Sequence, residues 1–182
     1  MIKQQGFTLT ELLVSLVISS ILMLTVSTFL IAGKASWKKQ LQLTSSQEIE
    51  RFAVLQLRRA IRQASAVMID SDQDQLILNY VAQEGSRNCL GQLQEAGESY
   101  IDRFHVSDDQ LRCNGQGLIS GLASIQFSYG MDKNKDGRID RSEFDTKPDS
   151  CCTVGSIEFT LALSGINEAQ PLMQYSAVLR RY

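Results

Sequence analysis

Hydrophobic positions divide the chain into a uniformly apolar stretch, an amphipathic stretch and a region of short alternating runs. No charged residue occurs from Leu12 to Gly33, and no proline interrupts these 22 residues. At about 1.5 Å per residue, a helix of this length spans about 33 Å, which matches the hydrocarbon core of a bilayer. A secretory signal peptide has an apolar region of only roughly 7–15 residues, followed by a small-residue cleavage site. The pattern therefore predicts a retained transmembrane helix within residues 7–33.

Residues 41–68, within the predicted amphipathic half of the helix, show apolar residues at helical spacing. These positions are Ile49, Phe52, Ala53, Leu57, Ala60, Ile61, Ala64 and Met68. Most of the charged residues lie off this stripe, so one helix face is expected to pack on a globular head while the other faces water. Arg58, Arg59 and Arg62 form a basic cluster that would either contact DNA or belong to a solvated or interface face, and the second case is the more common one.

Residues 69–182 lose the helical period and show short alternating or apolar runs separated by Gly, Asn, Asp and Ser. Such runs predict β-strands. The expected strands are 75–81, 100–106, 118–129, 154–163 and 173–180, with a long surface loop at 82–99. The predicted fold class is α+β, in which one long N-terminal helix packs on an antiparallel β-sheet head.

Composition narrows the function classes. The chain has 182 residues, 43% of them hydrophobic, and a net charge of −2, which is typical of one globular domain and not of a dedicated nucleic-acid binder. Residues 1–65 carry a net charge of +5 and residues 66–182 one of −7. His105 is the one histidine, so histidine-based catalysis and a histidine-rich zinc site are not expected, and His105 is interpreted as a structural side chain.

The segment Gly6-Phe7-Thr8-Leu9-Thr10-Glu11-Leu12 follows a short polar leader that contains Lys3. It resembles the class III leader of type IV prepilins and of type II secretion pseudopilins. The resemblance implies that a prepilin peptidase cleaves after Gly6 and methylates the amine of Phe7. Residues 1–6 would then be the leader, 7–33 the transmembrane and assembly half of the helix, 34–68 its amphipathic half, and 69–182 the head.

Glu11 is an unusual residue for a membrane anchor, because a carboxylate at mid-membrane costs about 2–3 kcal/mol on insertion scales. The resemblance implies that Glu11 pairs with the N-terminal amine of a neighbouring subunit during assembly. Two opposite charges in a helix bundle are each costly alone and tolerable together. The positive-inside rule disagrees, because Lys34, Lys38 and Lys39 would place the head in the cytoplasm. Since long domains cross membranes regardless of charge, a periplasmic head is expected.

Three further segments carry a more specific resemblance. Residues 48–64 are similar to a helix segment of PilW-type minor pilins and the related J-type minor pseudopilins. Residues 122–132 with Asp136-Gly137, and residues 154–163, are similar to two further segments of PilW-type proteins. The resemblance implies a non-enzymatic subunit in the bacterial inner membrane and then in the pilus. It would act with other minor pilins, the major pilin and the inner-membrane assembly platform, and DNA or surface binding stays open. A J-type pseudopilin, an adhesin and a calcium-dependent hydrolase are the alternatives; no catalytic set supports the last.

Residues 132–143 match the twelve-residue calcium loop, D-x-[DN]-x-[DN]-G-x5-E, at every required position. The predicted ligands for Ca²⁺ are Asp132, Asn134, Asp136, Arg138 through its carbonyl, Asp140 and Glu143. Gly137 would permit the sharp turn. The residues before the loop alternate like a strand, so a static clamp is expected in place of the helix pair of a sensor. The alternative is an acidic turn that binds no ion.

The four cysteines Cys89, Cys113, Cys151 and Cys152 are expected to be oxidised in a periplasmic or extracellular head. Three pairings are possible. We favour Cys89–Cys113, which closes a loop of roughly 25 residues and would stabilise the fold by about 3 kcal/mol. Cys151 and Cys152 would then form a strained direct bridge, unless both cross-link to the other two cysteines. The paired C-x2-C spacing of zinc sites is absent.

Overall fold

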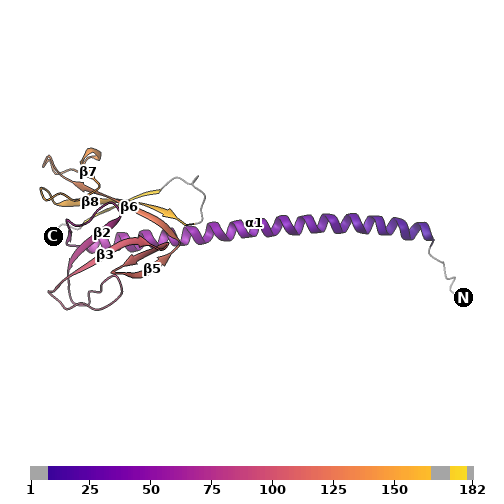
Figure 1. Ribbon diagram of the computed structural model, residues 1–182, viewed down its shortest axis with the longest axis horizontal. Coiled ribbons are helices and arrows are strands. Elements are labelled where there is room, and N and C mark those ends of the chain that lie inside the picture. The colour runs from indigo at the N-terminus through magenta and orange to yellow at the C-terminus, as the bar shows by residue number, and fades with distance from the viewer. Residues whose placement is uncertain (1–7, 165–172, 180–182) are drawn as a thin grey trace. The chain divides into compact units, whose positions relative to one another are not determined.

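The computed structural model describes residues 8–164 and 173–179 (Figure 1). The chain forms two compact units, residues 1–45 and residues 46–182. Helix α1, Leu9–Gln63, contributes its first part to one unit and its last part to the other. The two units are therefore described separately.

The first unit contains the apolar part of α1, and its large apolar side chains are more than half exposed. They include Leu12, Leu16, Ile21, Leu24, Phe29, Ile31, Trp37 and Leu41. The segment Leu9–Lys38 is long and apolar enough to cross a membrane. Its hydroxyl groups bond within the helix: Ser15 Oγ donates to the Leu12 carbonyl at 2.9 Å and Ser19 Oγ to the Ser15 carbonyl at 2.7 Å. These bonds satisfy polar groups that would otherwise be unpaired in an apolar environment.

The last part of α1 buries one face in the head. Ala53, Leu57 and Ile61 are fully buried, as the helical stripe predicted. Phe52 was assigned to that stripe, and this is wrong, because Phe52 is 57% exposed while Val54 is buried. At about 100° per residue, position 52 points away from the centre of the stripe and position 54 lies at its edge.

The helix ends five residues earlier than predicted. It was expected to continue to Met68, but α1 ends at Gln63, and Ala66–Val67 form strand β1. The backbone N–H of Ser65 donates to the Asn79 carbonyl at 2.8 Å, and that of Met68 to the Ile77 carbonyl at 2.9 Å. Pairing with a strand therefore replaces the helical hydrogen bonds at this point.

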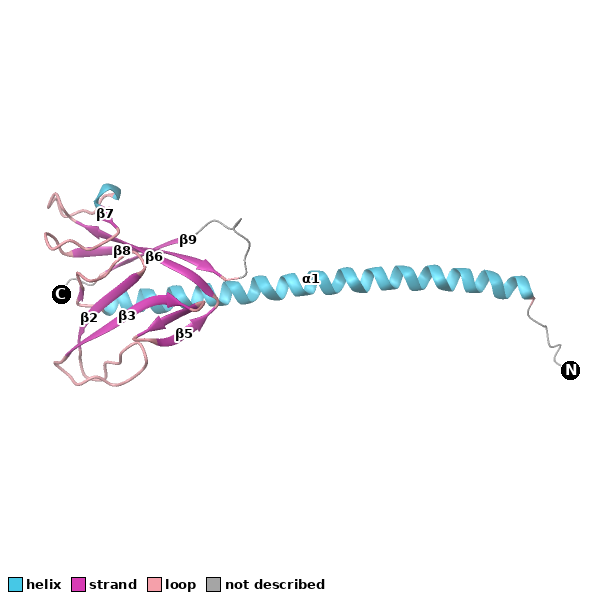
Figure 2. Ribbon diagram, viewed as in Figure 1, coloured by secondary structure: helices cyan, strands magenta, loops and turns pink. Residues whose placement is uncertain are grey.

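The head contains two antiparallel sheets (Figure 2). The first has the order β1-β2-β3-β4-β5, with β2 at Gln75–Val81, β3 at Ser99–Ser107, β4 at Gln110–Cys113 and β5 at Gln116–Ser120. The second has the order β7-β6-β8-β9, with β6 at Leu122–Met131, β7 at Phe144–Asp145, β8 at Val154–Leu163 and β9 at Met173–Val178. The 3-10 helix η1, Arg141–Glu143, directly precedes β7.

Hydrogen bonds join β6 of the second sheet to the turn before β2, and aromatic side chains pack within the second sheet. The backbone N–H of Phe127 donates to the Gln73 carbonyl at 2.7 Å, and the Tyr129 hydroxyl donates to the Asp72 carbonyl at 2.8 Å. Phe127 is paired with Phe159 on β8, and their ring centroids lie 6.4 Å apart. These aromatic residues are almost completely buried, so they form the centre of the head's core.

The predicted fold class is confirmed, with strands divided between two sheets in place of one. The range predicted for one strand, 118–129, covers the end of β5 and most of β6, which are separated by Gly121. Gly121 has φ +96°, and a Cβ there would lie 2.8 Å from Cδ1 of Ile49. Glycine therefore allows both the left-handed turn and the close approach of α1.

Candidate functional site

The predicted processing and assembly residues lie at the start of the chain. Gly6 and Phe7 are outside the described residues. Glu11 is exposed in the first turn of α1, where its backbone N–H donates to the Thr8 carbonyl at 3.1 Å. The Thr8 hydroxyl lies 3.4 Å from the Glu11 carboxylate. An acid in the first turn is favoured by the helix dipole, so Glu11 has a local stabilising role in addition to any role between subunits.

The twelve-residue acidic loop, residues 132–143, connects β6 to β7. Tyr129 and Gly130 of β6 pair with Asp145 and Phe144 of β7, so the loop closes an antiparallel hairpin through η1. The strand before the loop was predicted from alternation, and β6 has this position. Gly137 has φ +84°, the left-handed conformation that the sharp turn requires.

The side-chain oxygens of the loop accept hydrogen bonds from its own backbone. Asp132 accepts from the N–H of Asp136 at 3.1 Å and from that of Gly137 at 2.9 Å. Asn134 Oδ1 accepts from the same Asp136 N–H at 2.9 Å, and Asp136 accepts from the N–H of Arg138 at 2.7 Å. The first, third and fifth residues of the loop are therefore turned toward its interior.

Glu143, the last residue of the loop, is buried and closes it. Its Oε1 accepts from the backbone N–H of Lys133 at 3.0 Å and of Asn134 at 3.2 Å, and its Oε2 accepts from that of Asp140 at 2.9 Å. The hydrogen bond from Asp140, followed by those from Asn134 and Lys133, lowers the pKa of this carboxyl group, although burial opposes the shift. Glu143 thus joins both ends of the loop.

The donor chemistry of the loop fits a hard cation, since every predicted ligand offers oxygen. Asp140 and Arg138, the ninth and seventh residues, belong to the same loop, with Asp140 directly before η1. Among the described residues, one group of three possible metal ligands has its ligand atoms within 4.8 Å of one another. None of these three residues belongs to the loop. The carboxylates of Asp132, Asp136 and Glu143 are hydrogen-bonded to backbone N–H groups.

The cysteines form Cys89–Cys113 and the direct bridge Cys151–Cys152. The first pair is the one favoured from the sequence, and it links the loop after β2 to the end of β4. The set within 4.8 Å consists of both of its sulfurs and a carboxylate oxygen of Asp102. Because these sulfurs are bonded to each other, they offer no thiolate to a metal.

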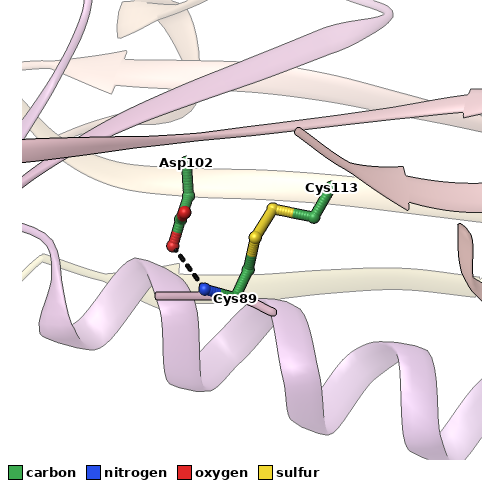
Figure 3. A group of neighbouring side chains, drawn as sticks. All are labelled: Cys89, Asp102 and Cys113. Atoms are coloured by element: carbon green, nitrogen blue, oxygen red, sulfur yellow. Dashed lines mark hydrogen bonds between the residues drawn. A yellow bond between two sulfur atoms is a disulfide. The ribbon is translucent and has the colours of Figure 1, made fainter. Parts of the chain in front are cut away.

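Asp102 is a site residue that no motif in the sequence indicates. It is 3% exposed on β3, and Figure 3 shows its carboxylate facing the backbone nitrogen of Cys89, which donates to it at 2.9 Å. The Asn114 amide also donates to it, at 3.0 Å. Burial raises the pKa of Asp102, and these two hydrogen bonds partly offset the shift. One sequence signal could have indicated it. Asp102 alternates with Tyr100 and Phe104 along the strand, so it is a charged residue on the strand face that is otherwise apolar.

The start of the chain matches a known family model. The model of the prokaryotic N-terminal methylation motif matches residues 1–27. Among curated proteins there is no match to the chain. The motif and the apolar part of α1 support a type IV pilin-like protein that is anchored in a membrane before it assembles. The motif implies processing by a prepilin peptidase and use of the pilus assembly machinery.

Proposed function

We propose that the chain is a PilW-like minor pilin that primes or supports type IV pilus assembly. It is a structural subunit near the filament tip and not an enzyme. It acts with other minor pilins, the major pilin and the inner-membrane assembly platform. Its head lies in the periplasm before assembly and on the pilus afterwards. The segments that resemble PilW-type proteins lie in the buried part of α1 and in β6 and β8.

One observation carries this proposal: a methylation motif leads directly into a helix whose apolar side chains are exposed on the chain itself. Such a helix needs lipid or other helices around it. Glu11, in its first turn, would be costly in that environment without a cationic partner. The amine of a processed Phe7 on a neighbouring subunit is a partner of the right charge.

The first test is the mature N-terminus. Mass spectrometry of protein from the native host should find a chain that begins with N-methylated Phe7. An intact Met1 would contradict the processing on which the proposal depends.

The second test concerns Glu11 in assembly. Glu11→Gln should reduce incorporation into filaments by about tenfold or more, because loss of one charge removes about 1.4 kcal/mol or more of pairing energy. Glu48→Gln, at an exposed position on the same helix, is the matched control and should assemble normally. Equal incorporation of both variants would contradict the pairing role.

The alternative is a J-type minor pseudopilin, which has the same type of leader and helix by resemblance. A deletion strain separates the two machines. Loss of surface pili with normal exoprotein secretion supports the minor pilin, whereas loss of secretion with normal pili supports the pseudopilin.

We further propose that residues 132–143 bind Ca²⁺. Asp132, Asn134, Asp136, the Arg138 carbonyl, Asp140 and Glu143 would hold the ion, which would offset the repulsion among four carboxylates and order the hairpin loop. The all-oxygen donor set and the left-handed Gly137 support this assignment.

Calorimetric titration of the full chain in detergent micelles tests the calcium site. The wild type should bind one Ca²⁺, and Asp132→Asn with Asp136→Asn should weaken binding by about tenfold or more, because two anionic ligands are lost. Asp70→Asn, at an exposed aspartate outside the loop, is the charge-matched control for each substitution. Absence of binding heat in the wild type would contradict the proposal and favour the alternative, an acidic turn that binds no ion.

A further inference from the structure

The two disulfides of the head differ in their access to solvent. At Cys89–Cys113, Cys113 is fully buried and Cys89 is half-buried. At Cys151–Cys152, Cys151 is exposed and Cys152 is half-buried. Thiol–disulfide exchange requires a thiolate to reach a sulfur atom. A protein reductant can therefore reach the second disulfide more easily than the first.

The charges around the two disulfides also differ. A carboxylate oxygen of buried Asp102 lies within 4.8 Å of both sulfurs of Cys89–Cys113 (Figure 3). This negative charge repels an attacking thiolate and the thiolate that would be released. Cys151 and Cys152 instead line a groove of about 1110 Å³. Its charged lining residues are Arg59, Arg87, Lys135, Glu84 and Asp132. The Asp149 carboxylate also accepts from the backbone N–H of Cys151 at 3.3 Å, so the charges near this disulfide nearly cancel. Among the described residues, no carboxylate lies as close to both sulfurs of this disulfide as Asp102 lies to those of Cys89–Cys113.

The two disulfides are coupled to folding to different extents. A disulfide restricts the unfolded chain in proportion to the logarithm of the loop it closes. Cys89 and Cys113 are 24 residues apart, whereas Cys151 and Cys152 are neighbours and close no loop of that kind. By thermodynamic linkage, the free energy by which the first disulfide stabilises the fold equals the free energy by which folding makes its reduction less favourable. The second disulfide receives almost none of this protection.

We propose that Cys151–Cys152 is a reversible thiol–disulfide exchange site for a dithiol protein reductant, and that Cys89–Cys113 is a permanent structural bridge. A thiolate of the reductant attacks Sγ of Cys151, which forms a mixed disulfide and breaks the bond to Cys152. The Cys152 thiolate takes up a proton. The second thiolate of the reductant then attacks its own half of the mixed disulfide and releases Cys151, which also takes up a proton. Two electrons and two protons pass from the dithiol to the cysteines.

Redox titration of the full chain in detergent micelles tests the difference. The protein is equilibrated with mixtures of reduced and oxidised dithiothreitol, alkylated, digested and analysed by mass spectrometry. Cys151 and Cys152 should be half-reduced at a reduced-to-oxidised ratio at least about tenfold lower than Cys89 and Cys113. Equal ratios, or earlier reduction of Cys89–Cys113, would overturn the proposal.

A trapping experiment tests the partner class. Thioredoxin that lacks its second active-site cysteine should form a mixed disulfide with Cys151 of the wild type. Trapping at Cys89 or Cys113, or no trapping at all, would overturn the proposal. The double variant Cys151→Ser/Cys152→Ser should lose the adduct while the reduction ratio of Cys89–Cys113 stays unchanged. A change in that ratio would show that the two disulfides are not independent and would also count against it.

Discussion

The two compact units of the chain place apolar side chains in opposite ways. In the first unit they are more than half exposed along α1, whereas in the head Leu57, Phe104, Phe127 and Phe159 are almost completely buried. A helix that is apolar on all faces is stable only where lipid or other helices surround it. Hydrophobic content alone therefore does not locate a core. The helical period does, because it is absent from the exposed part of α1 and present in the buried part.

Two leucines of α1, two positions apart, differ in burial in the same way. Leu57 is fully buried, while Leu55 is 56% exposed. Leu57→Ala should lower the free energy of unfolding by about 2–5 kcal/mol, because it removes buried contacts and leaves a cavity. Leu55→Ala should change it by no more than about 0.5 kcal/mol. Denaturant titration of the full chain in micelles, followed by circular dichroism, measures both. Equal losses would show that the buried face is misassigned.

Hydrophobic patterns predicted the strands whose bounds depend on the local sequence alone. Strands β2 and β8 have the predicted bounds, 75–81 and 154–163, because β2 is a short apolar run and most of β8 alternates between apolar and other residues. The separation of β5 from β6 was not predicted. It depends on the close approach of Ile49 to Gly121, a contact between residues far apart in the sequence. The two-sheet arrangement has the same origin, since strand pairing is a property of the tertiary structure.

In the candidate sites, too, the sequence did not predict contacts between residues from different elements. The loop motif predicted the left-handed conformation of Gly137, because the turn itself requires it. It did not predict that Glu143 would accept three backbone hydrogen bonds from both ends of the loop. The burial of Asp102 beside Cys89 depends on how β3 meets the preceding loop, which periodicity does not describe. Motifs thus predicted local geometry, and tertiary contacts determined the environment of each charge.

A smaller effect is expected where a polar group joins the two sheets of the head. The Tyr129 hydroxyl lies 2.8 Å from the Asp72 carbonyl and 3.1 Å from the Gln75 carbonyl. Tyr129→Phe should lower the free energy of unfolding by about 1–2 kcal/mol, because the half-buried Asp72 carbonyl loses the hydroxyl donor. The Gln75 carbonyl keeps the backbone N–H of Asp72 as a donor at 2.9 Å. Tyr100→Phe is the matched control, since its hydroxyl makes one long, exposed contact of 3.4 Å with the Arg87 carbonyl. A similar loss in both variants would indicate a general effect of removing hydroxyl groups.

The smallest expected effect concerns Glu143, and its sign depends on pH. Because backbone hydrogen bonds lower the pKa of the folded carboxyl group, the unfolded chain binds more protons at mildly acidic pH. The stabilising contribution of Glu143 is therefore complete above its ordinary pKa of about 4.3 and is lost as the pH falls through the folded value. Glu143→Gln should destabilise the calcium-free protein at pH 7, because an amide cannot accept all three hydrogen bonds. The difference from the wild type should shrink at acidic pH.

The variant is needed because the wild-type curve contains opposing contributions. Burial raises the pKa of Asp102, so this residue lowers stability as the pH rises from its ordinary pKa of about 3.9 through its folded value. Subtracting the curve of Glu143→Gln from that of the wild type removes the contribution of Asp102 and isolates that of Glu143. Glu98→Gln, at an exposed glutamate, is the control for the loss of one surface charge. A difference for Glu143→Gln that stayed constant from pH 7 to acidic pH would show that its hydrogen bonds do not depend on the charge of the carboxylate.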